Sequence, residues 1–273
     1  MSQRSIDTGS DHITARVEDR VAWITLNRPE ARNALSGPML QGLALALDDA
    51  ERASDVGAVG LTGAGAAFCS GGDVPNFPTG EEGKAARAAR ANEPPRPLQE
   101  TNDAYNMRNA KKLSVGAING YAVGAGFGLA LACDIRIASE NAQFGSFEIR
   151  RGLPNPPDPP ICLIGFGPAL HMLLSGDLID AQEALRIGLV TKVVSAQELI
   201  PTVEELAARM GEYPTEVLVA TKKAAFAGRD MTAEQSHQYA RALSAPLRDS
   251  DISREGVAAF AERRKANYGE SAS

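Results

Sequence analysis

The pattern of apolar and polar residues near the start of the chain predicts a hairpin of two strands. Apolar and polar residues alternate over Ile13–Glu18, Val21–Leu26 is largely apolar, and only Asp19 and Arg20 separate the two segments. Two short strand-like segments with a two-residue connection are typical of a β-hairpin. Residues 1–10 are mostly polar and predict a flexible tail ahead of it.

Strand and helix patterns alternate after the hairpin. Short apolar segments predict inner strands at Val56–Thr62 and Ser114–Ile118, and Ser36 before Pro38 predicts the start of a helix. From residue 201 onward only helical patterns remain. Strands and helices in alternation, followed by helices alone, predict the α/β class. We expect a core over residues 11–200 and a C-terminal helical region over residues 201–273.

Composition and charge narrow the classes of function. The chain has 273 residues, of which 44% are apolar, and its net charge of −6 argues against a nucleic-acid partner. Its three cysteines lack metal-type spacing, so we expect thiols in a reducing compartment and no metal site. The N-terminus does not resemble a signal peptide, and Gly120–Cys133 is too short and glycine-rich to span a membrane. A cytoplasmic protein without membrane contact is expected.

Two glycine-rich segments are candidates for chemistry. Gly63–Asp73 and Gly120–Gly128 each follow a predicted buried strand. Glycines allow main-chain N–H groups to point into a pocket, and a helix beginning near Gly126 would add the positive end of its dipole. Two converging N–H groups form an oxyanion hole, which stabilises a developing enolate. Alternatively, the glycines only permit close packing of helix and strand. The G-x-G-x-G spacing does not match the dinucleotide-binding fingerprint.

Five segments together carry a resemblance to a known family. They are VAWITLNRPEARNALS, GAGAAFCSGGDV, VGAINGYAVGAGFGLALACDIRIASENAQFG, ALRIGLVTKVV and AFAERRKANYG. In this order they resemble the crotonase superfamily of enoyl-CoA hydratases and isomerases, over about residues 12–268. The resemblance implies a crotonase-like spiral of β-β-α units and a C-terminal helical trimerisation region. It also implies a homotrimer or dimer of trimers, and an acyl-CoA thioester substrate. Coenzyme A is part of that substrate, and no separate cofactor is expected.

The resemblance also implies roles for individual residues. The backbone N–H groups of Ser70 and Ala125 match the two oxyanion donors, and Glu148 in FGSFE matches a catalytic carboxylate. Arg263 matches a basic residue that reaches the coenzyme A of a neighbouring subunit. The remaining residues implied in binding substrate or coenzyme A are Arg28, Ala31, Ala67, Phe68, Gly71, Asp73, Gly124 and Gly128.

One carboxylate of the pair used by typical hydratases is missing, because Gly128 stands at the position of the first glutamate. A single carboxylate can still accept a proton and return it. We therefore expect isomerisation, hydrolysis or C–C bond cleavage rather than ordinary hydration. A non-catalytic acyl-CoA-binding or assembly protein on the same fold is the alternative.

The segment Arg151–Pro160 is rich in proline, which removes backbone donors, so it predicts neither a helix nor an inner strand. Asp158 within it is a candidate to replace the missing glutamate. An exposed turn aspartate is the other interpretation of this residue.

Overall fold

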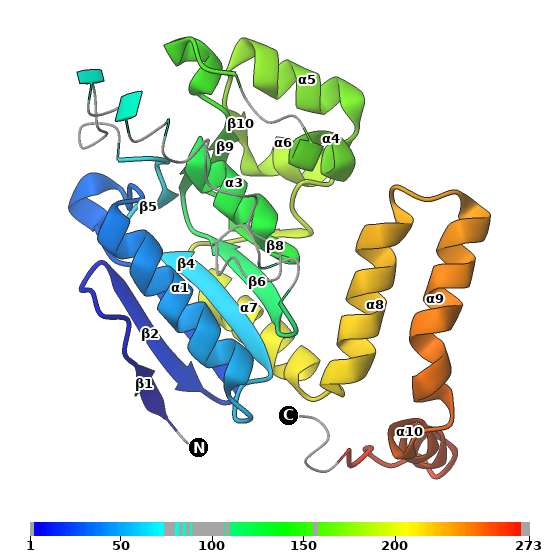
Figure 1. Ribbon diagram of the computed structural model, residues 1–273. Coiled ribbons are helices and arrows are strands. Elements are labelled where there is room, and N and C mark those ends of the chain that lie inside the picture. Colours follow the sequence, from blue (N-terminus) through cyan, green and yellow to red (C-terminus); the bar gives the residue numbers. More distant parts are fainter. Residues whose placement is uncertain are drawn as a thin grey trace.

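The computed structural model shows a mixed α/β fold built on two sheets (Figure 1). It describes residues 3–73, 80–81, 84–85, 88, 107, 110–154 and 158–268. The larger sheet has the order β1 (Arg4–Ile6), β2 (Ile13–Glu18), β3 (Val21–Leu26), β4 (Ala58–Gly63), β6 (Leu113–Ile118), β8 (Ile135–Ser139) and β11 (Lys192–Val194). The smaller sheet has the order β10 (Ile179–Asp180), β9 (Gln143–Gly145), β7 (Tyr121–Val123) and β5 (Ala67–Cys69).

The chain crosses repeatedly from the larger sheet to the smaller one. It passes from β4 to β5, from β6 to β7 and from β8 to β9. The strands β4, β6 and β8 are parallel neighbours in the larger sheet, and β5, β7 and β9 are parallel neighbours in the smaller sheet. This confirms the expected spiral, and it stacks successive turns of the chain side by side.

The helices cover both faces of the larger sheet or extend beyond it. Helix α1 packs on the face to which Ala22, Ile24 and Leu26 point, and α7 packs on the face of Val21 and Trp23. Because side chains of a strand alternate between its faces, the apolar β3 supplies both layers. The helices of the described residues are α1 (Gly37–Arg52), α3 (Ala125–Ala132), α4 (Asp158–Ile164), α5 (Phe166–Ser175), α6 (Ala181–Arg186), α7 (Leu199–Gly211), α8 (Thr215–Gly228), α9 (Ala233–Arg248) and α10 (Asp251–Ala261).

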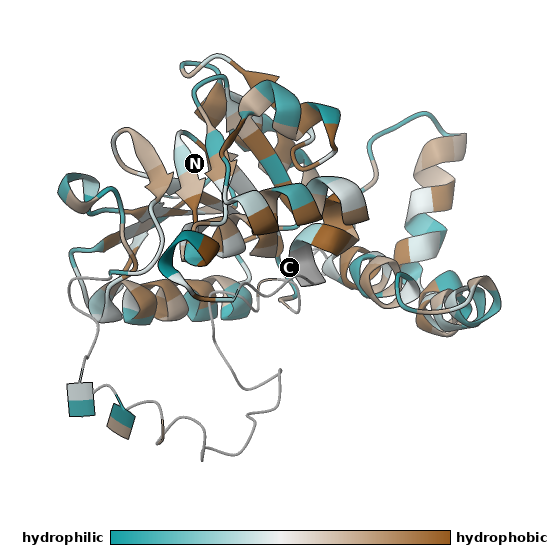
Figure 2. Cartoon of the chain, turned by 90° about the horizontal axis from the view of Figure 1, so that it is seen from above, coloured by the Kyte–Doolittle hydropathy of each residue, from teal (hydrophilic) through white to brown (hydrophobic). Residues whose placement is uncertain are grey.

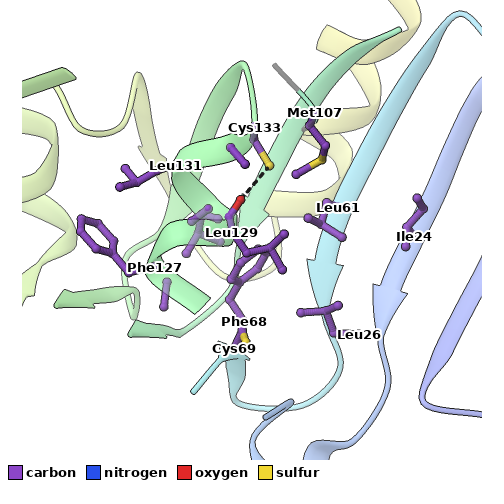
Figure 3. Packing of buried hydrophobic residues seen from close by; sticks show 14 of the residues in the cluster. Ile24, Leu26, Leu61, Phe68, Cys69, Met107, Phe127, Leu129, Leu131 and Cys133 are labelled. Carbon is purple, nitrogen blue, oxygen red and sulfur yellow. Dashed lines mark hydrogen bonds between the residues drawn. The ribbon is translucent and has the colours of Figure 1, made fainter. Parts of the chain in front are cut away.

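The main hydrophobic cluster joins the two sheets through α3. Phe68 from β5 and Leu129 from α3 are both fully buried in it, close to Leu61 of β4 (Figure 3). The hydropathy colours show apolar residues gathered in the strands and helices at the centre of this core (Figure 2). Burial of these side chains is the main stabilising contribution to the fold, and it fixes α3 against β5. No helix among the described residues is both long and apolar enough to cross a membrane.

A buried ion pair connects α8 to the core. The ammonium group of Lys222 lies 2.9 Å from Oδ2 of Asp134 and also donates to the carbonyl oxygens of Met107 (2.7 Å) and Ala110 (3.1 Å). Burial raises the pKa of Asp134, although Lys222 and donors from Ser114 oppose this rise. Oδ1 of Asp134 is buried without a hydrogen-bond partner among the described residues. The carboxylate therefore depends on Lys222 for compensation of its charge.

Lys222→Met should destabilise the protein by about 3–5 kcal/mol, because the substitution leaves a buried carboxylate without its cation. Thermal and chemical unfolding measure this loss. The control is Lys223→Met, which removes the same charge from an exposed position on the same helix and should change stability by no more than about 0.5 kcal/mol. Equal stabilities of the two variants would contradict the role given to the buried pair.

Two expectations about local structure are wrong. Within the predicted flexible tail, Arg4–Ile6 forms β1 and pairs with β2, because the side chain of Arg4 is bound by Asp49 and Asp55. Within the proline-rich segment, α4 begins at Asp158. Its prolines lie in the first helical turn, where a backbone N–H has no intrahelical acceptor and its loss costs little. The boundary expected at residue 200 stays a prediction, and α7 beyond it packs on the sheet.

Candidate active site

Three segments of the candidate site lie at one edge of the smaller sheet. Residues 70–73 follow β5, Gly124 follows β7, and Ser146 follows β9. These three strands are parallel neighbours, so their carboxyl ends meet at the same edge. The spiral thereby brings together segments that are far apart in the sequence.

The N-terminus of α3 lies at the centre of this edge. Gly124 precedes the helix with φ of 57°, a left-handed conformation that favours glycine. Its N–H donates to the carbonyl of Gly145 (2.9 Å), which ties the end of β7 to the end of β9. Ala125 is the first residue of α3, so its backbone N–H lies in the first helical turn. The positive end of the helix dipole therefore faces this edge.

Glu148 extends its carboxylate to this helix end. Glu148 is the first residue of the short 3-10 helix η4 (Glu148–Arg151) and is half-buried. A Cβ placed on Gly124 would lie 3.1 Å from Oε1 of Glu148 and 3.9 Å from Oε2. The absence of a side chain at Gly124 thus makes room for the carboxylate. Ser146 donates from its hydroxyl to Oε2 at 3.1 Å.

Ser70 does not supply an oxyanion donor, so the expectation from the resemblance is wrong. Its N–H donates to the carbonyl of Arg32 (3.0 Å), and its hydroxyl donates to the carbonyl of Ala31 (3.3 Å). Both groups are engaged by the polar loop that follows β3. Ser70 therefore holds two loops together.

The N–H group of the neighbouring Gly72 is better oriented for the role of oxyanion donor. Gly72 was not among the residues expected from the sequence. The carbonyl of Gly71 accepts from the N–H of Leu35 (2.8 Å). In a trans peptide the C=O and N–H groups point in opposite directions, so the N–H of Gly72 points away from Leu35. Gly71 itself has φ of 98°, and a Cβ on it would lie 3.4 Å from the amide nitrogen of Ala125. The 71–72 peptide is therefore adjacent to the start of α3.

An ion pair fixes the loop that carries Gly72. Nη1 of Arg28 lies 3.0 Å from Oδ2 of Asp73 and also donates to the carbonyl of Ala34 (3.0 Å). The two charged side chains are only 16% and 11% exposed, so solvent screens them little. The ion pair therefore positions this loop, and binding of substrate or coenzyme A by Arg28 and Asp73 stays a prediction.

Other predicted binding residues have mainly structural contacts. The side chain of Phe68 is fully buried in the hydrophobic cluster, and the carbonyl of Ala67 accepts from Asn33 (2.8 Å). Cys69 between Phe68 and Ser70 is buried, which raises the pKa of its thiol to about 12 and makes it a poor nucleophile. The described residues contain no cluster of three or more His, Cys, Asp and Glu side chains suited to a metal ion.

The remaining candidates differ in how close they lie to Glu148. Gly128 is one turn into α3, and its N–H donates to the carbonyl of Gly124 (3.1 Å), so both positions lie on one helix face. Arg263 is exposed and follows α10, which lies far from α3 in Figure 1. The side chain of Asp158 lies outside the described part of the chain.

Comparison with known proteins gives a family for this arrangement. The family model for enoyl-CoA hydratase/isomerase matches residues 16–271. The (E)-benzylidenesuccinyl-CoA hydratase of Thauera aromatica is 38% identical over 257 residues, covering 92% of this chain and 96% of that protein. The 2,3-dehydroadipyl-CoA hydratase of Escherichia coli is 32% identical, with 95% and 98% covered.

Solved structures agree with the sequence relatives. An enoyl-CoA hydratase from Bacillus anthracis superposes with a TM-score of 0.84 at 29% identity, and the match covers 94% of this chain and 98% of that one. The match thus extends over nearly the whole length of both chains. The chain therefore belongs to the enoyl-CoA hydratase/isomerase family within the crotonase superfamily.

Proposed function

We propose that this protein moves a proton at the carbon next to the carbonyl of an acyl-CoA thioester, with Glu148 as its single general acid and base. The observation that carries this proposal is the position of the Glu148 carboxylate, beside Gly124 at the N-terminus of α3. Coenzyme A enters as part of the substrate, and the reaction as proposed uses no further cofactor or metal.

The N–H groups of Gly72 and Ala125 form the proposed oxyanion hole. They come from adjacent loops after β5 and β7, and the dipole of α3 adds to their field. Hydrogen bonds donated to the thioester oxygen stabilise it most when it carries the negative charge of an enolate. The carboxylate of Glu148 next to them then exchanges a proton with the adjacent carbon.

Addition of water to a 2-enoyl-CoA is the reaction that we propose for this site. The relatives named as hydratases favour it over the isomerisation, hydrolysis and C–C cleavage expected from a lone carboxylate. Glu148 takes a proton from water while the water oxygen bonds to C3, and the C2–C3 double bond becomes the enolate. Glu148 then returns that proton to C2, so that one water is added overall.

A bulky acyl group is the proposed substrate class, because Gly128 contributes no side chain on the helix face that carries Gly124. The 38% identical relative is named for a benzylidene-substituted acyl group, which supports a branched or aromatic enoyl-CoA. We also propose a trimer or a dimer of trimers, in which Arg263 reaches the coenzyme A of a neighbouring subunit. The exposure of Arg263 and the distance of α10 from α3 support that contact.

Incubation with a panel of thioesters tests the proposed reaction. The panel contains aromatic, branched and short straight-chain enoyl-CoA together with β-ketoacyl-CoA, and mass spectrometry follows the products. We expect the aromatic or branched enoyl-CoA to gain one water. An unchanged mass with a new retention time, or release of coenzyme A, would replace hydration by isomerisation or by hydrolysis and cleavage. No change in any thioester would indicate a binding protein instead.

Ala125→Pro tests the oxyanion hole, since proline has no N–H. Proline is favoured at the first position of a helix, so the variant should fold. We expect its kcat to fall by about 10²–10³-fold, as for loss of one oxyanion donor. Ala125→Gly, which keeps the N–H, is the control and should remain nearly as active as the wild type. Full activity in the folded proline variant would place the oxyanion hole elsewhere.

A further inference from the structure

Ser146 is a buried residue whose side chain contacts the carboxylate of Glu148. It is only 5% exposed, and its hydroxyl donates to Oε2 of Glu148 at 3.1 Å. We infer that Ser146 is a positioning residue that holds Oε2 and thereby makes Oε1 the atom that exchanges the proton with substrate. This inference rests on the proposed function.

Backbone hydrogen bonds of the adjoining Gly145 fix the position of Ser146, independently of its side chain. Ser146 follows the last residue of β9, Gly145, which pairs with Val123 of β7. The carbonyl of Gly145 also accepts from the N–H of Gly124. The β-ladder that sets the start of α3 therefore also sets Ser146, and the hydroxyl donor has a defined place relative to the helix end.

The two oxygens of Glu148 are in different surroundings. Oε2 accepts from Ser146, whereas Oε1 is the oxygen nearer to Gly124, at 3.1 Å from the position of a Cβ there. The hydrogen bond from Ser146 engages Oε2 and fixes its direction, which leaves Oε1 as the oxygen that faces the helix end. Oε1 therefore takes the proton, on the side of the helix end and the proposed oxyanion hole.

A site with a single carboxylate has particular need of such a contact. Gly128 leaves no second carboxylate on this face of α3 to share the work. If Glu148 must act first as base and then as acid, the same oxygen has to remain within reach of the reacting carbon in both steps. A fixed hydrogen bond to Oε2 restricts rotation of the carboxylate and so maintains that geometry.

Ser146→Ala should lower kcat by about 10- to 100-fold, as expected for loss of a hydrogen bond to a charged group. The assay uses the thioester of the panel that the wild type converts fastest. KM should stay within about twofold. Ser146→Thr keeps the hydroxyl and should recover most of the activity, and Ser146→Cys, a weaker donor, should fall between. The control is Ser139→Ala, which removes another buried serine hydroxyl, on β8, and should leave kcat unchanged.

A double-mutant cycle distinguishes positioning from a general loss of structure. If Ser146 acts through the carboxylate, adding Ser146→Ala to Glu148→Gln should change kcat by less than about twofold. An equal loss in both backgrounds, or a normal kcat in Ser146→Ala, would overturn the inference. A normal kcat in Glu148→Gln would instead overturn the proposed function, so the two failures can be told apart.

Discussion

Replacement of Glu148 by Gln is expected to lower kcat by about 10²–10⁴-fold while acyl-CoA binding remains nearly intact. Gln has the size of Glu and can accept a hydrogen bond from Ser146, but it cannot take up and return a proton. Steady-state kinetics on the best thioester of the panel measure kcat, and titration calorimetry measures binding. Since no second carboxylate stands at Gly128, we expect no compensation from α3.

The matched control is Glu140→Gln, which makes the same chemical change at an exposed position beyond β8. Its kcat should equal that of the wild type. Full activity in Glu148→Gln would show that another group moves the proton. A loss of binding as large as the loss of kcat would show that Glu148 holds substrate rather than acting on it.

Gly128→Glu is expected to create or raise hydration of crotonyl-CoA by about 10²–10⁴-fold, the usual contribution of a positioned acid or base. Position 128 is one helical turn from Gly124, and the Glu148 carboxylate lies beside Gly124. Carboxylates at both places can hold a water between them. The unmodified protein should hydrate this short straight-chain substrate only weakly.

Gly128→Gln and Gly128→Ala are the controls for this substitution, because they add bulk without an acid. Neither should raise crotonyl-CoA hydration, and all three should hinder the bulky enoyl-CoA. A Gly128→Glu variant that unfolds at much lower temperature would show that position 128 is packed, since burial of an unpaired carboxylate is costly. Fast crotonyl-CoA hydration by the wild type would show that another group replaces the missing acid.

The sequence pattern predicted those elements whose determinants are local. The bounds of β2 and β3 agree with the prediction, and Asp19 and Arg20 between them both have positive φ, as in the two-residue turns that suit the twist of a hairpin. Ser36 caps α1 through its side chain, as its place before Pro38 indicated. Such features depend on residues within one or two turns of each other.

The missed features depend on contacts between distant segments. Strands β5 and β9 have three residues each, too few for an alternation to be visible, and each is defined by its neighbour β7. The choice between Ser70 and Gly72 depends on the direction of single peptide groups, which is set by pairing with the loop after β3. The resemblance indicated Glu148 as a catalytic carboxylate, whereas the contact between Glu148 and Ser146 is visible only in the three-dimensional structure.

Glu148 alone is proposed to move the proton at the carbon next to the thioester carbonyl. The most direct measurement is incorporation of deuterium from D₂O at C2 of the acyl-CoA, followed by mass spectrometry with wild type and Glu148→Gln. We predict incorporation by the wild type and almost none by Glu148→Gln, at equal occupancy with acyl-CoA. Equal incorporation by both proteins would show that another group moves the proton. No incorporation by the wild type would show that no proton is exchanged at C2.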